Sequence, residues 1–473
     1  MPYVLGIDVG TGHTRAAISR HTPNGWSDPV LVGLGAQQPT MPTVVHLDAD
    51  RSATVGDEAE QRSAADPTRI ARGFSARIGD DVPFLLGGAP CTPQELTAVL
   101  IRWVTDLVAG REGGPAAQIV VTHRAGWGAY RQNLLHHELA RQGLTDVTLR
   151  PEPVAVAEGY APAGDLVAVV GFGTAAEAAV LRRRDDGVFE LAGQAEGDDD
   201  LGGGGFDDAI MECVRGQAGS ALDQLDPTEP SAWLALAELR GVCVTAKELL
   251  STETEVIVPV RLPAGPTEVR VTRADFERII RPSVVAGVQL LRRVTRSVGV
   301  ESAELGSVVL VGGSGRIPLV AGLVGAVSPN GVVVAAEPDA TVAVGAAFAA
   351  RRLLTGPDRP VPALAHTEVI QRSAIALYTG EETVADPAES EVAPPPRPPI
   401  DIIPLDLPTR GWTERLLPRV RPAVLTVSTI VLLAIGVALT FLFEAGNHQT
   451  PTSPLHLGPP RPAANTSVSS SNP

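Results

Sequence analysis

Residues 4–19 of the chain read VLGIDVGTGHTRAAIS. An apolar run ends at a glycine turn that carries hydroxyl groups, and a second apolar run follows, which predicts two strands joined by a tight turn. The backbone N–H groups of such a turn can surround a phosphate, and an aspartate at the strand end can hold magnesium through its water shell. The candidate phosphate contacts are Gly10, Thr11, Gly12 and His13, and the candidate magnesium carboxylate is Asp8. An ordinary β-hairpin explains the same pattern equally well.

Two further glycine turns open predicted helices. Residues 307–318 read SVVLVGGSGRIP, and residues 200–207 read DLGGGGFD. A glycine turn lets a ligand approach the backbone closely, and the flat guanidinium of Arg316 can stack on a purine ring. The candidate nucleotide contacts in these segments are Gly202, Gly203, Gly204, Gly312, Gly313, Ser314 and Arg316. A plain strand-to-helix turn and a flexible loop are the alternative interpretations of the two segments.

The composition excludes one class of partner. The chain has 473 residues and a formal net charge of −16 at pH 7, whereas broad nucleic-acid binding needs a basic surface. The three cysteines are widely spaced and form neither a metal-ligand spacing nor a disulfide framework. Among the 38 lysine and arginine residues the only lysine is Lys247. We therefore expect no nucleic-acid partner, and the position of the single lysine becomes informative.

Seven segments, taken in chain order, resemble the nucleotide-binding domain of the seventy-kilodalton heat-shock proteins, the DnaK-type chaperones of the actin-like ATPase superfamily. The first hairpin resembles the family's first phosphate loop. The segment 244–251, VTAKELLS, resembles the helix whose lysine and serine contact adenosine. The other segments with this resemblance are 41–45 with 55–59, 151–157, 200–207, 312–318 and 337–346. Seven matches in order are more specific than any one of them.

The resemblance implies an α/β fold of two lobes, each with a five-stranded mixed sheet flanked by helices. It implies that ATP or ADP binds with Mg²⁺ between the lobes. It also implies that Glu152 and Asp8 are the catalytic carboxylates and that both belong to the magnesium shell. The further nucleotide contacts that it implies are Gly173, Thr174, Lys247, Ser251 and Asp339.

The chain departs from the family pattern at groups that serve hydrolysis. Residues 171–176 read GFGTAA where the family has Asp-Leu-Gly-Gly-Gly-Thr, and Ser75 occupies the position of the family's catalytic lysine. Arg72 and Arg77 are candidate substitutes, although a guanidinium is not equivalent to a compact ammonium. Loss of one such group typically costs ~10²–10³ in rate. The pattern therefore predicts nucleotide binding with doubtful hydrolysis.

The C-terminal part of the chain has a different composition. Residues 423–443 carry no charged side chain, and about 20 such residues suffice for a helix to cross a bilayer; a buried core helix is the alternative. Three arginines between 415 and 421 precede the run, so the positive-inside rule places the N-terminal domain in the cytoplasm. We expect a nucleotide-binding domain at 1–354, a Pro-rich spacer at 355–422, a transmembrane helix at 423–443 and a disordered extracytoplasmic tail at 444–473.

These expectations predict a single-pass protein of the cell membrane whose cytoplasmic domain binds ATP. Nucleotide would set the angle between the lobes, and a cytoplasmic protein partner would read it. The spacer leaves no room for the peptide-binding and lid domains of the family's chaperones. The alternative functions are a slow ATPase that assists protein folding as a chaperone, and a scaffold that polymerises beneath the membrane.

Overall fold

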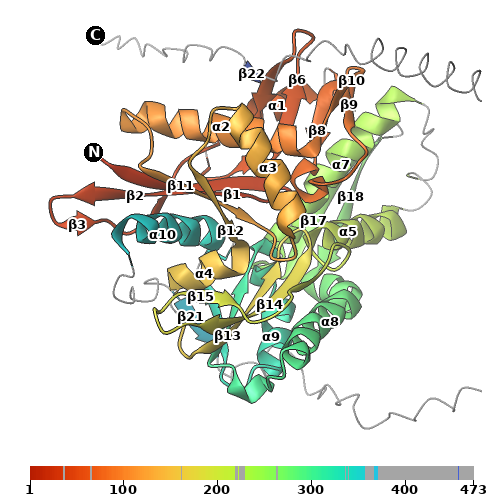
Figure 1. Ribbon diagram of the computed structural model, residues 1–473. Helices are drawn as coiled ribbons and strands as arrows, with labels where there is room; N and C mark the ends of the chain where they lie inside the picture. Colours follow the sequence, from red (N-terminus) through yellow and green to blue (C-terminus); the bar gives the residue numbers. More distant parts are fainter. Residues whose placement is uncertain are drawn as a thin grey trace, which may run out of the picture. The chain divides into compact units, whose positions relative to one another are not determined.

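The computed structural model describes residues 1–356 except 36–37, 64–65, 161, 219–221, 223–228, 263–264, 336 and 339, together with 367–370 and 456–457. These residues form two lobes, each built around a mixed seven-stranded sheet (Figure 1). Most of the predicted spacer and tail, and all of the predicted transmembrane helix, lie outside the described residues. No helix of the described part is long and apolar enough to span a membrane.

The sheet of the first lobe has the strand order β12-β11-β1-β2-β3, and β4 and β5 also pair with β2. Its strands are β1 (Tyr3–Val9), β2 (His13–Thr22), β3 (Gly25–Trp26), β4 (Val30–Leu31), β5 (Met41–Pro42), β11 (Gln118–His123) and β12 (Val147–Pro151). Along β1, Leu5 and Ile7 join one core cluster while Val4 joins another on the opposite face. Burial on both faces explains the nearly continuous apolar run in this strand.

The sheet of the second lobe has the order β15-β14-β13-β19-β20-β21, with β16 paired to β14. Its strands are β13 (Leu166–Phe172), β14 (Ala176–Arg183), β15 (Phe189–Leu191), β16 (Glu196–Asp198), β19 (Ser307–Val311), β20 (Val332–Ala335) and β21 (Thr367–Ile370). In both lobes the first strand of an antiparallel hairpin is also parallel to a following strand, β1 to β11 and β13 to β19. Each sheet has seven strands rather than the predicted five, because short strands of two to four residues add to the longer ones.

Helices cover both sheets. They are α1 (Gly56–Ser63), α2 (Pro93–Glu112), α3 (Ala129–Arg141), α4 (Glu152–Tyr160), α5 (Gly203–Ala218), α7 (Pro230–Leu249), α8 (Arg273–Ser297), α9 (Pro318–Ala326) and α10 (Thr341–Thr355). Helix α2 begins at the N-cap Thr92, whose side chain accepts the N–H of Glu95, and ends at Gly113 in the left-handed conformation. Helix α10, rich in alanine, packs on β1, β2 and β11 and against α4 (Figure 1). Helices α4 and α10, which overlap the family-like segments 151–157 and 337–346, are thus in direct contact.

Smaller elements complete the described part. They are the short helices η1 (Pro67–Arg69), η2 (Phe74–Arg77), η3 (Ser302–Glu304) and η4 (Gly313–Arg316), and the strands β6 (Val44–Leu47), β7 (Ser52–Val55), β8 (Ile70–Arg72), β9 (Phe84–Leu86), β10 (Ala89–Cys91), β17 (Glu255–Leu262), β18 (Gly265–Thr272) and β22 (His456–Leu457). Strand β22 lies in the predicted disordered tail, yet it pairs parallel to β7 at the end of the order β22-β7-β6-β8. An edge strand offers unpaired N–H and C=O groups that a further strand can satisfy.

Candidate functional site

The turns of the β1–β2 and β13–β14 hairpins, one from each lobe, lie next to each other. A Cβ atom on Gly12 would lie 3.6 Å from Oγ1 of Thr174. Within the first turn, a Cβ atom on Gly10 would lie 2.8 Å from the carbonyl oxygen of His13, so only glycine fits there. The fold therefore brings the candidates of the first phosphate loop, Thr11 included, beside Thr174 of the second loop.

Asp8 lies near the end of β1 and is almost fully buried. Oγ1 of Thr122 on β11 donates a 2.8 Å hydrogen bond to its Oδ1 atom. Burial raises the pKa of Asp8, and the positive charge of Arg15 and the Thr122 hydrogen bond oppose this rise. The carboxylate is thus fixed in position with one oxygen already partnered.

Glu152 is the first residue of α4 and directly follows β12. Burial raises its pKa well above the usual range, the negative charges of Asp8 and Glu177 add to the rise, and Arg124 opposes it. A cation between Asp8 and Glu152 would relieve this repulsion, and Mg²⁺ usually binds through one or two carboxylates and several waters. No three acidic, histidine or cysteine side chains of the described residues are placed to hold a metal ion. The two carboxylates fit a largely hydrated magnesium ion.

The glycine turn at 202–204 packs directly against the second hairpin turn. The N–H of Gly203 donates to the carbonyl oxygen of Gly173 at 2.7 Å, and the N–H of Gly204 donates to that of Thr174 at 3.1 Å. A Cβ atom on Gly202 would lie 2.5 Å from Cα of Ala175. The glycines are needed because two backbones touch at this point.

Lys247 points from the last turn of α7 toward this glycine turn. Its Nζ atom lies 2.7 Å from Oδ1 of Asp207 and donates to the carbonyl oxygen of Gly203 at 3.3 Å. A Cβ atom on Gly203 would lie 2.8 Å from Oγ of Ser314. Gly312 has a φ of 89°, and a Cβ atom there would lie 2.5 Å from the carbonyl group of Phe172. Three segments far apart in sequence therefore meet around Gly203.

The structure places the other predicted contacts less closely. Gly313 and Arg316 lie in η4, and both residues are exposed. Ser251 follows the end of α7, where its N–H donates to the carbonyl oxygen of Glu248. Asp339 lies outside the described residues. Purine stacking by Arg316 and adenosine contact by Ser251 stay predictions.

Comparison with known proteins identifies the family of the chain. A family model described as Hsp70 protein matches residues 82–371, more than half of the chain. The chain belongs to the Hsp70 family. It is 30% identical over 374 residues to chaperone protein HscA homologs of Pseudomonas fluorescens and Pseudomonas putida, and 29% identical to that of Azotobacter vinelandii. These alignments cover 74% of this chain and 57% to 58% of the relatives, so the chain spans little more than half their length.

The altered second loop of this Hsp70 member has an ordinary backbone. Thr174 and Ala175 do not take positive φ, and among the described residues Arg51 is the only non-glycine residue that does. The hairpin closes with Phe172 opposite Ala176 in the ladder, and Gly173 is the one glycine of the family pattern that this turn retains.

Both arginines predicted to substitute for the family's lysine pair with carboxylates other than Glu152. Arg72 pairs with Glu60 at 2.6 Å, and Arg77 pairs with Asp80 at 3.1 Å and lies over the ring of Phe84. Both arginines are held on the surface by these local partners, which sequence alone does not reveal.

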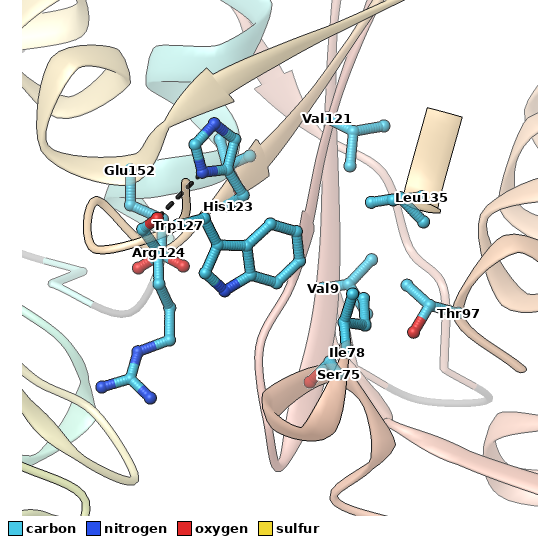
Figure 2. Close-up of a pocket in the computed structure, with 11 residues that line it drawn as sticks. Val9, Ser75, Ile78, Thr97, Val121, His123, Arg124, Trp127, Leu135 and Glu152 are labelled. Carbon is cyan, nitrogen blue, oxygen red and sulfur yellow. Dashed lines mark hydrogen bonds between the residues drawn. The ribbon is translucent and has the colours of Figure 1, made fainter. Parts of the chain in front are cut away.

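A different arginine occupies the region. Arg124 directly follows β11 and lines a small cavity with Ser75, Trp127 and Glu152 (Figure 2). Arg124 was not among the residues predicted from the sequence, although ligand sites of α/β sheets gather where strands end at their carboxyl side. The position of the Hsp70 lysine, Ser75, and the new cation thus share one cavity with Glu152.

Proposed function

We propose that the chain binds ATP or ADP with Mg²⁺ between its two lobes and acts as a nucleotide-dependent switch. The meeting of one hairpin turn from each lobe with the Gly203, Lys247 and Ser314 cluster carries this proposal. Members of the Hsp70 family bind these nucleotides with Mg²⁺. A ligand that contacts both lobes shifts their equilibrium by its differential affinity for the two arrangements.

Each part of the site has a role in this proposal. The N–H groups around Gly10 and Gly12 and the hydroxyl of Thr11 hold phosphate oxygens, because turn amides favour anions. Asp8 and Glu152 hold the waters of magnesium, whose charge neutralises the phosphates when it is bound. Lys247 and Ser314 fix the adenosine end. The predicted purine contact of Arg316 and the contacts of Gly173, Gly204, Gly313, Ser251 and Asp339 belong to the same proposal.

Thermal unfolding of the full chain tests nucleotide binding. Millimolar ATP with Mg²⁺ should raise the apparent Tm, because a ligand at 100 times its Kd stabilises the folded state by ~2.7 kcal/mol. Equal concentrations of inorganic triphosphate with Mg²⁺ serve as the control for general anion effects. An unchanged Tm with ATP, or an equal rise with triphosphate, would refute the proposed nucleotide site.

A slow chaperone ATPase is the second candidate. The buried pair of Asp8 and Glu152 favours it, because Glu152 can orient a water and Arg124 supplies a cation in the same cavity. Steady-state phosphate release by the full chain, compared with Glu152→Gln, distinguishes the two functions. Equal background release from both proteins leaves the switch; a loss of at least ~10²-fold in the variant establishes hydrolysis.

We also propose that residues 423–443 anchor the protein in the cell membrane, with the N-terminal domain in the cytoplasm and the tail outside. The absence of charge in this run and the arginines before it support the proposal. Cell fractionation of the chain with and without 423–443 tests the anchor. Protease treatment of intact cells tests the position of the tail, because a tail outside the membrane and the pairing of β22 with β7 exclude each other. Protection of a C-terminal tag would refute the outside position.

A nucleotide-dependent switch acts through a partner that distinguishes its nucleotide states, and we propose that this partner is a cytoplasmic protein. The HscA homologs that resemble this chain are named chaperones, but the chain matches only about 57% of their length. Pull-down with the full chain in ATP and in ADP would test the proposal. A partner retained equally in both nucleotides would contradict a nucleotide-controlled interaction.

A further inference from the structure

Arg124 belongs to the first lobe by sequence but makes its ion pair with the second. It follows β11, whereas Asp199 follows β16, which pairs with β14. The Nη1 atom of Arg124 lies 2.6 Å from Oδ1 of Asp199. The pair therefore connects the two lobes through one charge-assisted hydrogen bond.

The loop that carries Arg124 is docked on the second lobe by its backbone as well. The N–H groups of Ala125 and Gly126 donate to the carboxylate of Glu177. Glu177 lies on β14 directly opposite Gly171 of β13, at the mouth of the second hairpin turn. A Cβ atom on Gly197 would lie 3.0 Å from Nη2 of Arg124, so this glycine leaves room for the guanidinium. The ion pair with Asp199, the backbone contact with Glu177 and the space left by Gly197 together place Arg124 against the second lobe.

The two ends of the ion pair differ in exposure. The side chain of Asp199 is 73% exposed, whereas that of Arg124 is 26% exposed. Arg124 also lines the cavity with Glu152 (Figure 2). The negative charge of Asp8, beside the first phosphate turn, raises the pKa of Glu152. Arg124 thus has a weakly held, exposed partner on one side and the phosphate end of the proposed nucleotide site on the other.

We propose that Arg124 exchanges Asp199 for the terminal phosphate of a bound nucleoside triphosphate, so that triphosphate binding changes the contact between the lobes. The inference rests on the proposed nucleotide site and names the residue that separates ATP from ADP within it. A guanidinium binds phosphate in a bidentate manner, while the pair with Asp199 has one end in water, which screens it. The exchange is therefore favourable when a terminal phosphate is present and reverses when it leaves.

Binding titrations of the full chain with ADP and with the imido-bridged analogue of ATP test the exchange. Asp199→Asn should bind the triphosphate analogue ~2–5-fold more tightly, because its competing charge is gone. Arg124→Ala should bind that analogue at least ~10-fold more weakly. ADP affinity should change less than ~2-fold in both variants, since no terminal phosphate is involved. Asp198→Asn removes the neighbouring charge at the end of β16 without breaking the pair and is the matched control.

The two variants should change the affinity for the triphosphate analogue in opposite directions, and this difference distinguishes the exchange from a purely structural role. If Arg124 serves only to hold the lobes together, both variants weaken binding, and they do so for both nucleotides. Asp199→Asn changes an exposed side chain, so the test does not depend on the folding of Arg124→Ala. Failure of the wild-type chain to bind either nucleotide refutes the proposed site itself. Normal binding with unchanged discrimination in both variants refutes only the role of Arg124.

Discussion

A Cβ atom on Gly345 would lie 2.5 Å from the carbonyl carbon of Ala155, so α10 and α4 cross with backbone against backbone. We expect Gly345→Ala to destabilise the fold by ~1–3 kcal/mol, because an added methyl group in a close-packed crossing forces the helices apart. The same separation should weaken nucleotide binding, since the two helices join the lobes. Thermal unfolding and a nucleotide titration of the full chain measure the two effects.

Gly110→Ala is the matched control for this substitution. Gly110 is also helical, in α2, but a Cβ atom there would meet nothing within 4 Å. Alanine should raise stability by ~0.5–1 kcal/mol, because it lowers the conformational entropy of the unfolded chain. A loss of stability at Gly110 as large as that at Gly345 would show that the helix crossing is not the cause.

Lys247→Ala should weaken binding of both ATP and ADP by ~10-fold or more, because it removes a charge-assisted contact at the end of the site that both nucleotides share. It also leaves the half-buried Asp207 without its 2.7 Å ion pair, so a modest loss of stability accompanies the change. Isothermal titration with both nucleotides measures the effect.

Arg240→Ala controls for this variant, since Arg240 joins the same two helices through an exposed 2.8 Å pair with Asp208. An exposed pair contributes little, so its nucleotide affinity should stay within ~2-fold of wild type. Equal weakening in both variants would argue that the helices, not the lysine, determine binding.

The raised pKa of Glu152 predicts a pH-dependent stability. Burial, Asp8 and Glu177 raise this pKa and Arg124 opposes the rise, so the protonated form is the one favoured in the folded state. The stability that this proton contributes is full below the ordinary glutamate pKa of about 4.3. It is lost as pH rises through the raised value. The nucleotide-free chain should therefore lose stability relative to Glu152→Gln over this window.

The difference in Tm between Glu152→Gln and wild type, followed from acid to neutral pH, measures the titration. It should grow with pH to roughly 2–5 °C, because one kcal/mol shifts Tm by about 2–4 °C in a domain of 150–250 residues. Mg²⁺ with nucleotide should reduce it by compensating the charge. A difference that stays constant with pH would contradict the raised pKa of Glu152.

Trp127 should report on the occupancy of the site. Its side chain is 8% exposed, stacks on His123 with ring centroids 5.3 Å apart, and lines the cavity with Ser75 and Glu152. Its Nε1 atom has no hydrogen-bond partner among the described residues. Nucleotide with Mg²⁺ should therefore change the tryptophan emission, and Trp127→Phe should abolish the change. Trp103→Phe, on α2 in the first-lobe core, should retain it; persistence of the change without Trp127 would contradict this placement.

The two-lobed fold could be predicted because seven short segments resemble the nucleotide-binding domain of the chaperone family in the same order. The run before Gly10 and the glycine turns at 202–205 and 312–313 each indicate a strand end or a helix start, and the resemblance implies how these elements assemble. The predicted number of strands in each sheet was wrong because two-residue strands such as Gly25–Trp26 carry no periodic pattern. Strand β22 could not be foreseen either, since pairing with β7 depends on an edge more than 400 residues away in the chain.

The charges of the site show a sharper limit. Arg72 and Arg77 lie near Ser75 in sequence, and that nearness suggested a replacement for the missing lysine. In the fold Arg72 pairs with Glu60 and Arg77 pairs with Asp80. Arg124, which directly follows β11, instead lines the cavity with Glu152. Likewise Glu177 faces the turn that has lost its aspartate because it is opposite Gly171 in the ladder. Sequence distance does not measure which charges share a site.

Lys247 also gives the molecule an unusual chemical property. Its ε-amine is the only side-chain amine in the sequence of 473 residues, and it lies between Asp207 and Gly203. Reagents that modify amines therefore have a single internal target. The reactivity of that target toward such a reagent, compared with and without nucleotide, would report whether the proposed nucleotide site is open or filled, without any engineered residue.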